Sequence, residues 1–187
     1  MKKTLLCLLL VLPIAHAERA DGYQKTMIKA RDTVSNMVTR VTTLTGNVEI
    51  RRGSLLIQAE HAVLTEDAQG YQHVVMNAQA GEPPVSFRQK RDGAGNVWME
   101  GQARQVVYDD RTEIVDLTDQ ALARRTTDGV LSDEVTGEHI IYKSRAEQYQ
   151  VTQLPGSTAT GDRRGVMVLQ PTRKDPLIHP LNATAAQ

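Results

Sequence analysis

A hairpin phrase that occurs twice constrains the fold of this chain more than any other feature. In LTGNVEIRRGSLLIQAEHAVL (44–64), apolar and polar side chains alternate on both sides of Gly53. Alternation with a period of two is typical of a β-strand with one apolar face, and two such strands around a glycine turn predict a hairpin. LTDQALARR (117–125) matches LTGNVEIRR (44–52) position for position, 73 residues later. The chain is therefore expected to repeat this hairpin.

The closing part of the hairpin also recurs. AEHAVL (59–64) is followed by the related phrases ARQVVY (103–108) and GEHIIY (137–142). Repeated hairpins without helices between them predict a sheet that grows by the addition of strands.

Short strand-like runs separated by turn residues continue through most of the chain. Pro83-Pro84 marks a corner or an edge, and residues 154–165 have the composition of a long loop. Residues 26–40 also place apolar side chains at helical spacing, but their Thr and Val content favours strands. With about a dozen short strands, the sequence predicts an all-β fold, a single antiparallel structure built from repeated hairpins.

The N-terminus has the features of an export signal. Lys2 and Lys3 precede an apolar run (5–14) that is too short to span a bilayer, and Ala15-His16-Ala17 is an A-x-A cleavage site. We therefore predict a signal peptide over 1–17, cleaved near Ala17, with an uncleaved anchor as the alternative. The single cysteine lies within this segment, so the mature protein is expected to hold no disulfide.

The remaining chain divides into one domain and a tail. Residues 18–170 contain all the strand-like runs, whereas 171–187 contains prolines and no periodic apolar face. We predict a β domain over 18–170 and a disordered tail over 171–187. The formal net charge of zero offers no basic surface, so nucleic acid is not expected as a partner.

Groups that could carry catalysis or hold a metal are few. His61 and His139 each follow a glutamate at equivalent positions of the closing phrase. Neighbours along a strand point to opposite faces, so these pairs do not converge on a metal, and the repeat accounts for their recurrence. No nucleophile or cofactor motif is recognisable. We predict that the protein is not an enzyme and assign it no catalytic residue, metal or cofactor.

The first strand of each repeat ends in a pair of arginines. The pair is Arg51-Arg52 in the first repeat and Arg124-Arg125 in the second. The favoured interpretation is a solvated strand end that keeps sheets from aggregating. The second interpretation is a rim that meets phosphates or sugar acids on a bound ligand.

LTGNVEI, the glycine turn and LLIQAEHAVL together resemble the LptA/OstA family of periplasmic lipopolysaccharide-transport proteins. Further matches are IKARD (28–32), PPVSF (83–87), EGQARQVVYDD (100–110), GEHIIY (137–142) and RGVMVLQP (164–171). The second repeat departs from the pattern because LTDQ replaces LTGN, which removes its Gly-Asn turn. The resemblance implies a β-jelly roll that is open along one seam and stacks end to end with like domains.

The resemblance also implies a function, a bridge that carries lipopolysaccharide between the inner and outer membranes. Each acyl CH₂ exposed to water costs about 0.8 kcal/mol, so a lipid with several chains needs an apolar slot to cross an aqueous compartment. The implied partners are lipopolysaccharide (its lipid A), inner-membrane LptC-like and outer-membrane LptD-like jelly rolls, and further copies head to tail. The alternative is a periplasmic adaptor domain that pairs with proteins by edge strands and binds no lipid.

Strand parity and the family pattern assign the residues of the slot and of the pairing edges. One edge is expected near 27–34, and the other is an uncharged strand between Gly165 and Pro171. The C-terminal edge is Val166, Met167, Val168 and Leu169. The predicted slot is lined by Ile28, Val48, Ile50, Leu55, Ile57, Phe87, Val106, Tyr108, Leu122, Ile140, Tyr142 and Met167.

Overall fold

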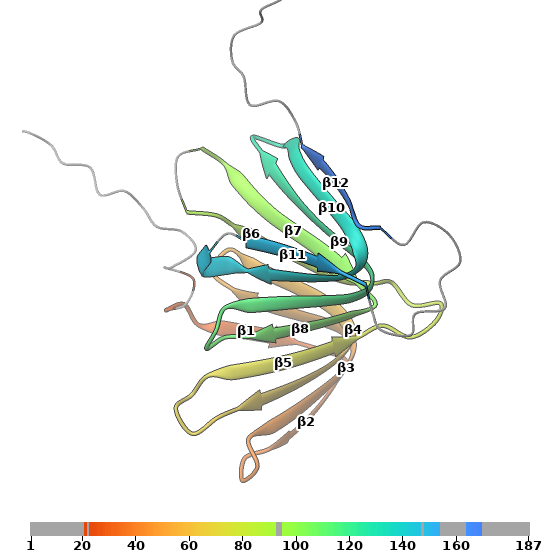
Figure 1. The fold of residues 1–187 in the computed structure, drawn as a ribbon. Coiled ribbons are helices and arrows are strands. Elements are labelled where there is room, and N and C mark those ends of the chain that lie inside the picture. The colour runs from red at the N-terminus through yellow and green to blue at the C-terminus, as the bar shows by residue number, and fades with distance from the viewer. Residues whose placement is uncertain (1–20, 22, 93–94, 147, 154–163, 170–187) are drawn as a thin grey trace, which may run out of the picture.

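The computed structural model describes residues 21, 23–92, 95–146, 148–153 and 164–169 (Figure 1). The predicted signal peptide and the predicted tail lie outside the described residues. Within them, no helix is long and apolar enough to cross a membrane.

The predicted all-β, antiparallel jelly-roll fold is confirmed, and every strand pair is antiparallel. A short 3₁₀ turn (Ser144–Ala146) precedes β11, and residues 26–40 form strands and a turn rather than a helix. The strands are β1 (Thr26–Lys29), β2 (Asp32–Asn36), β3 (Val41–Arg52), β4 (Leu55–Glu66), β5 (Gln72–Asn77), β6 (Val85–Lys90), β7 (Val97–Ala103), β8 (Gln105–Asp109), β9 (Ile114–Thr127), β10 (Val130–Lys143), β11 (Gln148–Thr152) and β12 (Val166–Leu169).

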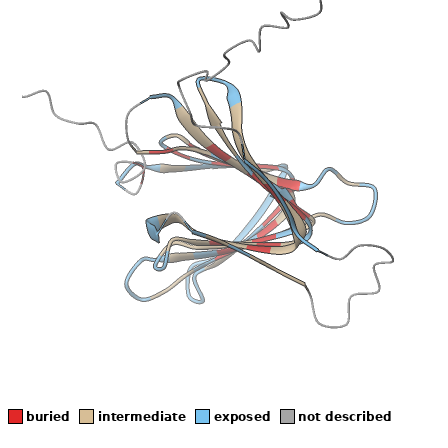
Figure 2. Ribbon diagram, turned by 45° about the horizontal axis from the view of Figure 1, so that its top comes forward, coloured by how far each residue is buried: buried red, intermediate tan, exposed pale blue. Residues whose placement is uncertain are grey.

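Four long strands, β3, β4, β9 and β10, divide the sheet into two layers because each contributes one half to each layer. The first layer has the order β1-β3-β4-β6-β7-β9-β10-β12. The second layer has the order β2-β3-β4-β5-β8-β9-β10-β11. Figure 2 shows the layers joined along one side and diverging on the other.

The long strands pass from one layer to the other at corners that the repeat supplies. In β3 the corner is Gly46-Asn47, with φ of 80° and 49°, and the β3–β4 ladder shifts register there. In β9 the corner is Asp119-Gln120, with φ of 64° and 54°. The LTDQ copy therefore keeps the left-handed backbone of LTGN although it has lost the residues that adopt it most easily. Position in the repeat, and not glycine, marks the corner.

The core lies between the layers and is organised in rows of cross-strand partners. In the first layer one row runs from edge to edge: Ile28, Ile50, Ile57, Phe87, Gly101, Ala123, Val135 and Met167. In the second layer a corresponding row is Thr33, Leu44, Ala62, Met76, Val106, Leu117, Ile140 and Val151. The inner members of both rows are buried, and the ends of the first row are exposed. An apolar stripe therefore spans the domain between its two edges.

Candidate functional site: a cavity between the two layers

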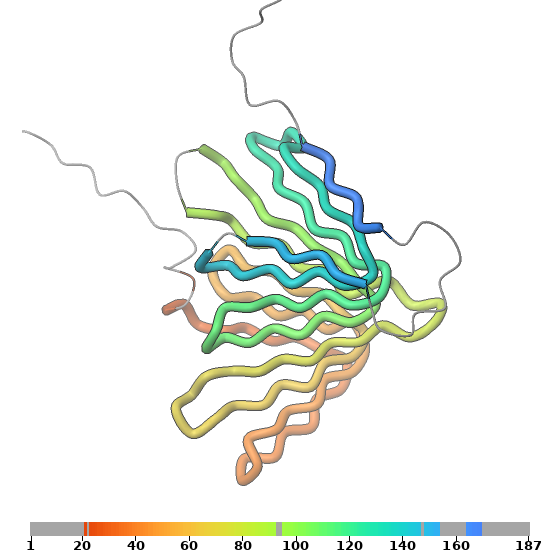
Figure 3. The backbone as a smooth tube through the Cα atoms, in the orientation of Figure 1, coloured from red at the N-terminus to blue at the C-terminus, as the bar shows by residue number. Residues whose placement is uncertain are grey.

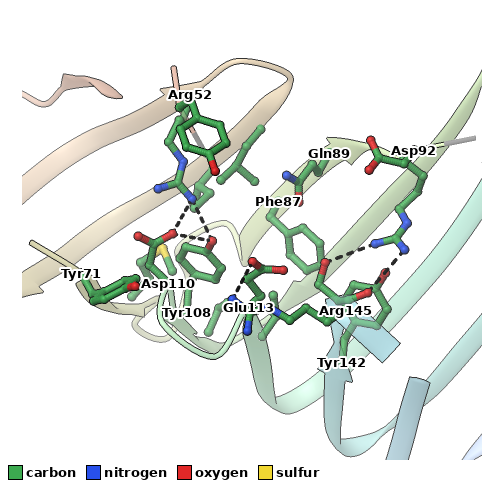
Figure 4. Close-up of a pocket in the computed structure, with 18 residues that line it drawn as sticks. Arg52, Tyr71, Phe87, Gln89, Asp92, Tyr108, Asp110, Glu113, Tyr142 and Arg145 are labelled. Atoms are coloured by element: carbon green, nitrogen blue, oxygen red, sulfur yellow. Dashed lines mark hydrogen bonds and ion pairs between the residues drawn. The ribbon is translucent and has the colours of Figure 1, made fainter. Parts of the chain in front are cut away.

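A cavity of about 730 Å³ lies between the layers on the side away from the corners. Its apolar floor comes from both layers, with Leu55, Ile57 and Phe87 in the first and Met76 and Val106 in the second. Charged and tyrosine side chains stand at strand ends around its mouth (Figure 4). The cavity thus has an apolar interior and a polar entrance, the arrangement that suits an amphiphilic ligand.

The structure gathers half of the twelve predicted slot residues around this cavity: Leu55, Ile57, Phe87, Val106, Tyr108 and Tyr142. Val48, Ile50 and Ile140 point into the same interior but are packed in the core, with exposed fractions of 2%, 4% and 0%. Ile28 and Met167 lie at the ends of the first-layer row and are partly exposed.

Leu122 lies on the outer face of the first layer, against the prediction. Its neighbours Ala121 and Ala123 are buried in the interior, and Leu122 instead lines a shallow outer groove with Leu56 and Arg124. The reason is strand alternation, because Leu122 stands at the repeat position of Glu49. The inner positions on either side of Leu122 hold alanine.

Alternation also separates the members of the two arginine pairs. Arg51 and Arg124 are on the outer face, where their Nε atoms donate to Glu49 Oε1 (2.9 Å) and Glu100 Oε2 (2.7 Å). Arg52 stands in the mouth of the cavity and is 9% exposed. Arg125 pairs with Asp133 in the same cross-strand row as Met99 of the core.

Arg52 connects the two layers across the mouth. From the end of β3 its Nη2 donates to Tyr108 Oη and to Asp110 Oδ1, each at 2.8 Å, on the second layer (Figure 4). Tyr108 Oη donates to the same carboxylate at 3.1 Å. Burial raises the pKa of the Tyr108 phenol, so its hydroxyl keeps the proton that it donates.

Other charged residues of the mouth form a second group near Tyr142. Arg91 Nη1 donates to Ser144 Oγ (3.3 Å), and its guanidinium lies 5.6 Å from the centre of the Tyr142 ring. Arg145 Nη2 donates to Glu113 Oε1 (3.0 Å). These residues were not predicted from the sequence, because they lie in turns or at strand ends outside the repeated phrase. Asp110 could have been found, since it shares strand parity with Tyr108.

Asp21 fixes the hairpin turn beside the cavity. This buried carboxylate accepts hydrogen bonds from Ser54 N (2.8 Å) and from Gln89 Nε2 (3.2 Å). A β-carbon on Gly53 would lie 1.9 Å from Asp21 Oδ1, which explains the glycine of the turn. The end of β3, and with it Arg52, is held in place from the N-terminal side.

In the structure, the histidines of the two Glu-His phrases have different polar partners. The imidazole of His61 pairs with Glu82 (3.1 Å), and that of His139 lies between Asp116 (2.8 Å) and Thr152 (2.9 Å). No group of three or more potential metal ligands occurs in the described part of the chain.

Both ends of the layers present strands with a partner on one side only, among the strands described. Within the described residues β12 pairs only with β10, and its four residues are between 46% and 65% exposed. At the other end, the edge expected near 27–34 is split into β1 and β2, which pair with different halves of β3. Figure 3 shows β2 and β12 at opposite ends of the molecule.

These features define a class of protein, a two-layered jelly roll with an apolar interior and, among the described strands, edge strands with a single partner at both ends. A family model described as LptA/(LptD N-terminal domain) LPS transport protein matches residues 27–148, more than half of the chain. The chain belongs to this family.

Two known proteins illustrate the similarity. The lipopolysaccharide export system protein LptA of Haemophilus influenzae is 29% identical over 161 residues, which cover 85% of this chain and 84% of that protein. The crystal structure of LptH, the LptA-homologous periplasmic component of the lipopolysaccharide transport device of Pseudomonas aeruginosa, superposes with a TM-score of 0.67. It is 22% identical and covers 81% of this chain and 99% of LptH, which shows a shared fold.

Proposed function

We propose that this protein is a periplasmic carrier of lipopolysaccharide that bridges the inner and outer membranes. It holds acyl chains in the cavity between its layers and passes them along jelly rolls stacked end to end. The observation that carries this proposal is the apolar floor contributed by both layers, open at a polar mouth. Family membership supports it, since relatives are named for lipopolysaccharide export and transport. Carrying lipopolysaccharide in this way requires an apolar path through the protein and no catalytic group.

The energetics agree with this role. An acyl chain of about a dozen carbons exposes apolar surface worth on the order of 10 kcal/mol in water. The cavity volume of about 730 Å³ lies within the range of small-molecule sites, roughly 300–1,000 Å³. The first-layer row extends the apolar surface to both edges, so that a chain could pass into a neighbouring domain.

The unpaired edges support the proposed partners. β12 would add to the N-terminal edge of the next copy, and the same edges would receive LptC-like and LptD-like jelly rolls. In this proposal the predicted signal peptide directs export to the periplasm and is then cleaved near Ala17.

Two adjacent residues of β4 test the lipid path. Ile57 lines the cavity, whereas Leu56 lines the outer groove. A photo-crosslinker at residue 57 should capture lipopolysaccharide in the intact protein, and the same group at residue 56 should not. Equal capture at both positions would contradict the inner path. No capture at either, with partner proteins still bound, would favour the adaptor function.

A charge on β12 tests the stacking. Val168→Lys places an ammonium on the unpaired edge and should shift the protein from longer species to monomer in sedimentation velocity. Val130→Lys is the matched control, because Val130 is 70% exposed at the β9–β10 turn. Unchanged elongation of the Val168 variant would exclude β12 as the pairing edge.

A further inference from the structure

We propose that Arg52 is the binding point for an anionic group, a phosphate monoester carried by the head of the bound amphiphile. The inference rests on the proposed function, since the acyl chains would lie in the cavity whose mouth Arg52 occupies.

The guanidinium is buried, and its donors are incompletely used. Arg52 is 9% exposed, and its Nη2 makes both bonds, to Tyr108 and to Asp110. Its buried Nε has no hydrogen-bond partner among the described residues. A buried donor without a partner is costly, and a guanidinium offers a fork that fits two oxygens of one phosphate. The Nε of Arg52 can therefore donate to a ligand oxygen, a partner that the described residues do not supply.

The position of Arg52 matches the geometry of an amphiphile. Its cross-strand partner is Leu55, which begins the apolar floor, and Ile57 follows in the same cavity. An acyl chain packed on this floor would bring an attached phosphate to the mouth. Arg145 and Tyr71, which line the same mouth, would lie near the head (Figure 4).

Asp110 occupies the place that the phosphate would take. Its Oδ1 accepts from both Arg52 and Tyr108, so the free protein satisfies the buried cation with an internal carboxylate. An incoming phosphate would replace one anionic partner by another, without leaving the guanidinium uncompensated. Asp110 is thus an internal competitor for the ligand.

The repeat provides an independent observation. Arg125 stands at the repeat position of Arg52, and its Nε is likewise buried without a partner in the part of the chain that the structure describes. Arg125 also pairs through Nη2 with one carboxylate, that of Asp133. The outward members of the same pairs, Arg51 and Arg124, have their Nε atoms bonded. Unused Nε donors therefore occur only at the inward positions of these two pairs.

The test compares two lipids that share acyl chains. Wild-type protein should bind lipid A with its phosphates about tenfold more tightly than dephosphorylated lipid A, measured by displacement of an apolar dye. Arg52→Gln should lose this preference while keeping its affinity for the dephosphorylated lipid. Arg51→Gln, on the outer face, should keep the preference. Arg52→Lys retains charge without the fork and should give an intermediate ratio.

Asp110→Asn separates binding from a purely structural role. If Arg52 receives the phosphate, removal of the competing carboxylate should increase the preference for phosphorylated lipid. If the Arg52–Asp110 pair only joins the layers, Asp110→Asn should instead lower the stability of the protein and leave the ratio of the two lipid affinities unchanged. That result would overturn the inference. Equal binding of both lipids by the wild-type protein would overturn the head-group inference but not the proposed lipid transport. Binding of neither lipid would overturn the proposed function as well. Displacement of phosphorylated lipid by inorganic phosphate from wild type, but not from Arg52→Gln, would assign the site to free phosphate and overturn the head-group inference.

Discussion

Phe87 and Gly101 are direct cross-strand partners, and the phenyl ring occupies the space that a side chain on Gly101 would need. A β-carbon at Gly101 would lie 2.3 Å from Phe87 Cε1 and 3.1 Å from Leu117 Cδ2 of the opposite layer. The glycine thus makes room for the aromatic ring of Phe87, which forms part of the cavity floor.

Gly101→Ala should therefore move the Phe87 ring and disturb the cavity. Overpacking of this kind costs about 1–3 kcal/mol of the free energy of unfolding. Urea denaturation should show this loss of stability, and the variant should also bind an apolar dye more weakly.

The combination with Phe87→Leu identifies the cause. A smaller side chain at residue 87 makes room for the alanine, so the double variant should be more stable than the sum of the single effects predicts. Strict additivity would show that the alanine acts elsewhere, for instance on Leu117.

The two corners of the repeat give a reciprocal prediction. Asn47 and Gln120 both have positive φ, but asparagine adopts this conformation more readily than glutamine. Gln120→Asn should stabilise the protein by about 0.5–1 kcal/mol, and Asn47→Gln should destabilise it by a similar amount. Chemical denaturation measures both. Shifts of the same sign would mean that side-chain contacts, and not backbone conformation, decide these positions.

Much of the fold could be predicted from the sequence because alternation is a local property. The hairpin around Gly53 and the inward facing of Val48 and Ile50 follow from parity alone. Alternation alone does not predict the division into two layers, because that division depends on a left-handed corner at Asp119-Gln120 that no glycine marks.

The candidate site was predictable only in part. Its floor is apolar and lies within the repeat, whereas its mouth is assembled from strand ends that meet only in three dimensions, such as Arg52 and Asp110. Alternation within the repeat separates Arg52 from Arg51, and it places Leu122 on the outer face with Glu49, its counterpart 73 residues earlier.

The attachment of β1 should be sensitive to acid. Glu49 accepts from Arg51 (2.9 Å) and from its cross-strand partner Lys29 (3.3 Å). The hydrogen bond from Arg51, and then that from Lys29, lower the pKa of Glu49 to about 2. Because the pKa is lower in the folded state, the stabilisation is present above the ordinary carboxyl value and is lost as the pH falls toward 2.

Wild-type protein should accordingly lose more stability than Glu49→Gln over this acidic interval, as measured by urea midpoints. The two proteins should differ less at high salt, which screens exposed pairs. If the stability of the two proteins depends on pH in the same way at low salt, the ion pairs of Glu49 contribute nothing to the attachment of β1.

The last prediction concerns how β12 is held against β10. Val151 of β11 fills the place where β11 ends and β12 begins, and two glycines make room for it. A β-carbon would lie 2.7 Å from Val151 Cγ1 at Gly137, and 2.5 Å from the same atom at Gly165. Gly165→Ala should push the backbone at residue 165 away from Val151 and loosen the pairing of β12 with β10.

Hydrogen exchange should then show faster exchange of the amides of 166–169, with little change in the buried half of β10. Val151→Ala removes the atom that obstructs the new methyl group, so the double variant should regain protection. Such rescue would show that the position of β12 depends on the contact between residues 151 and 165. Failure of the rescue would mean that residue 165 acts through its backbone, and that the position of β12 is set by its ladder with β10 alone.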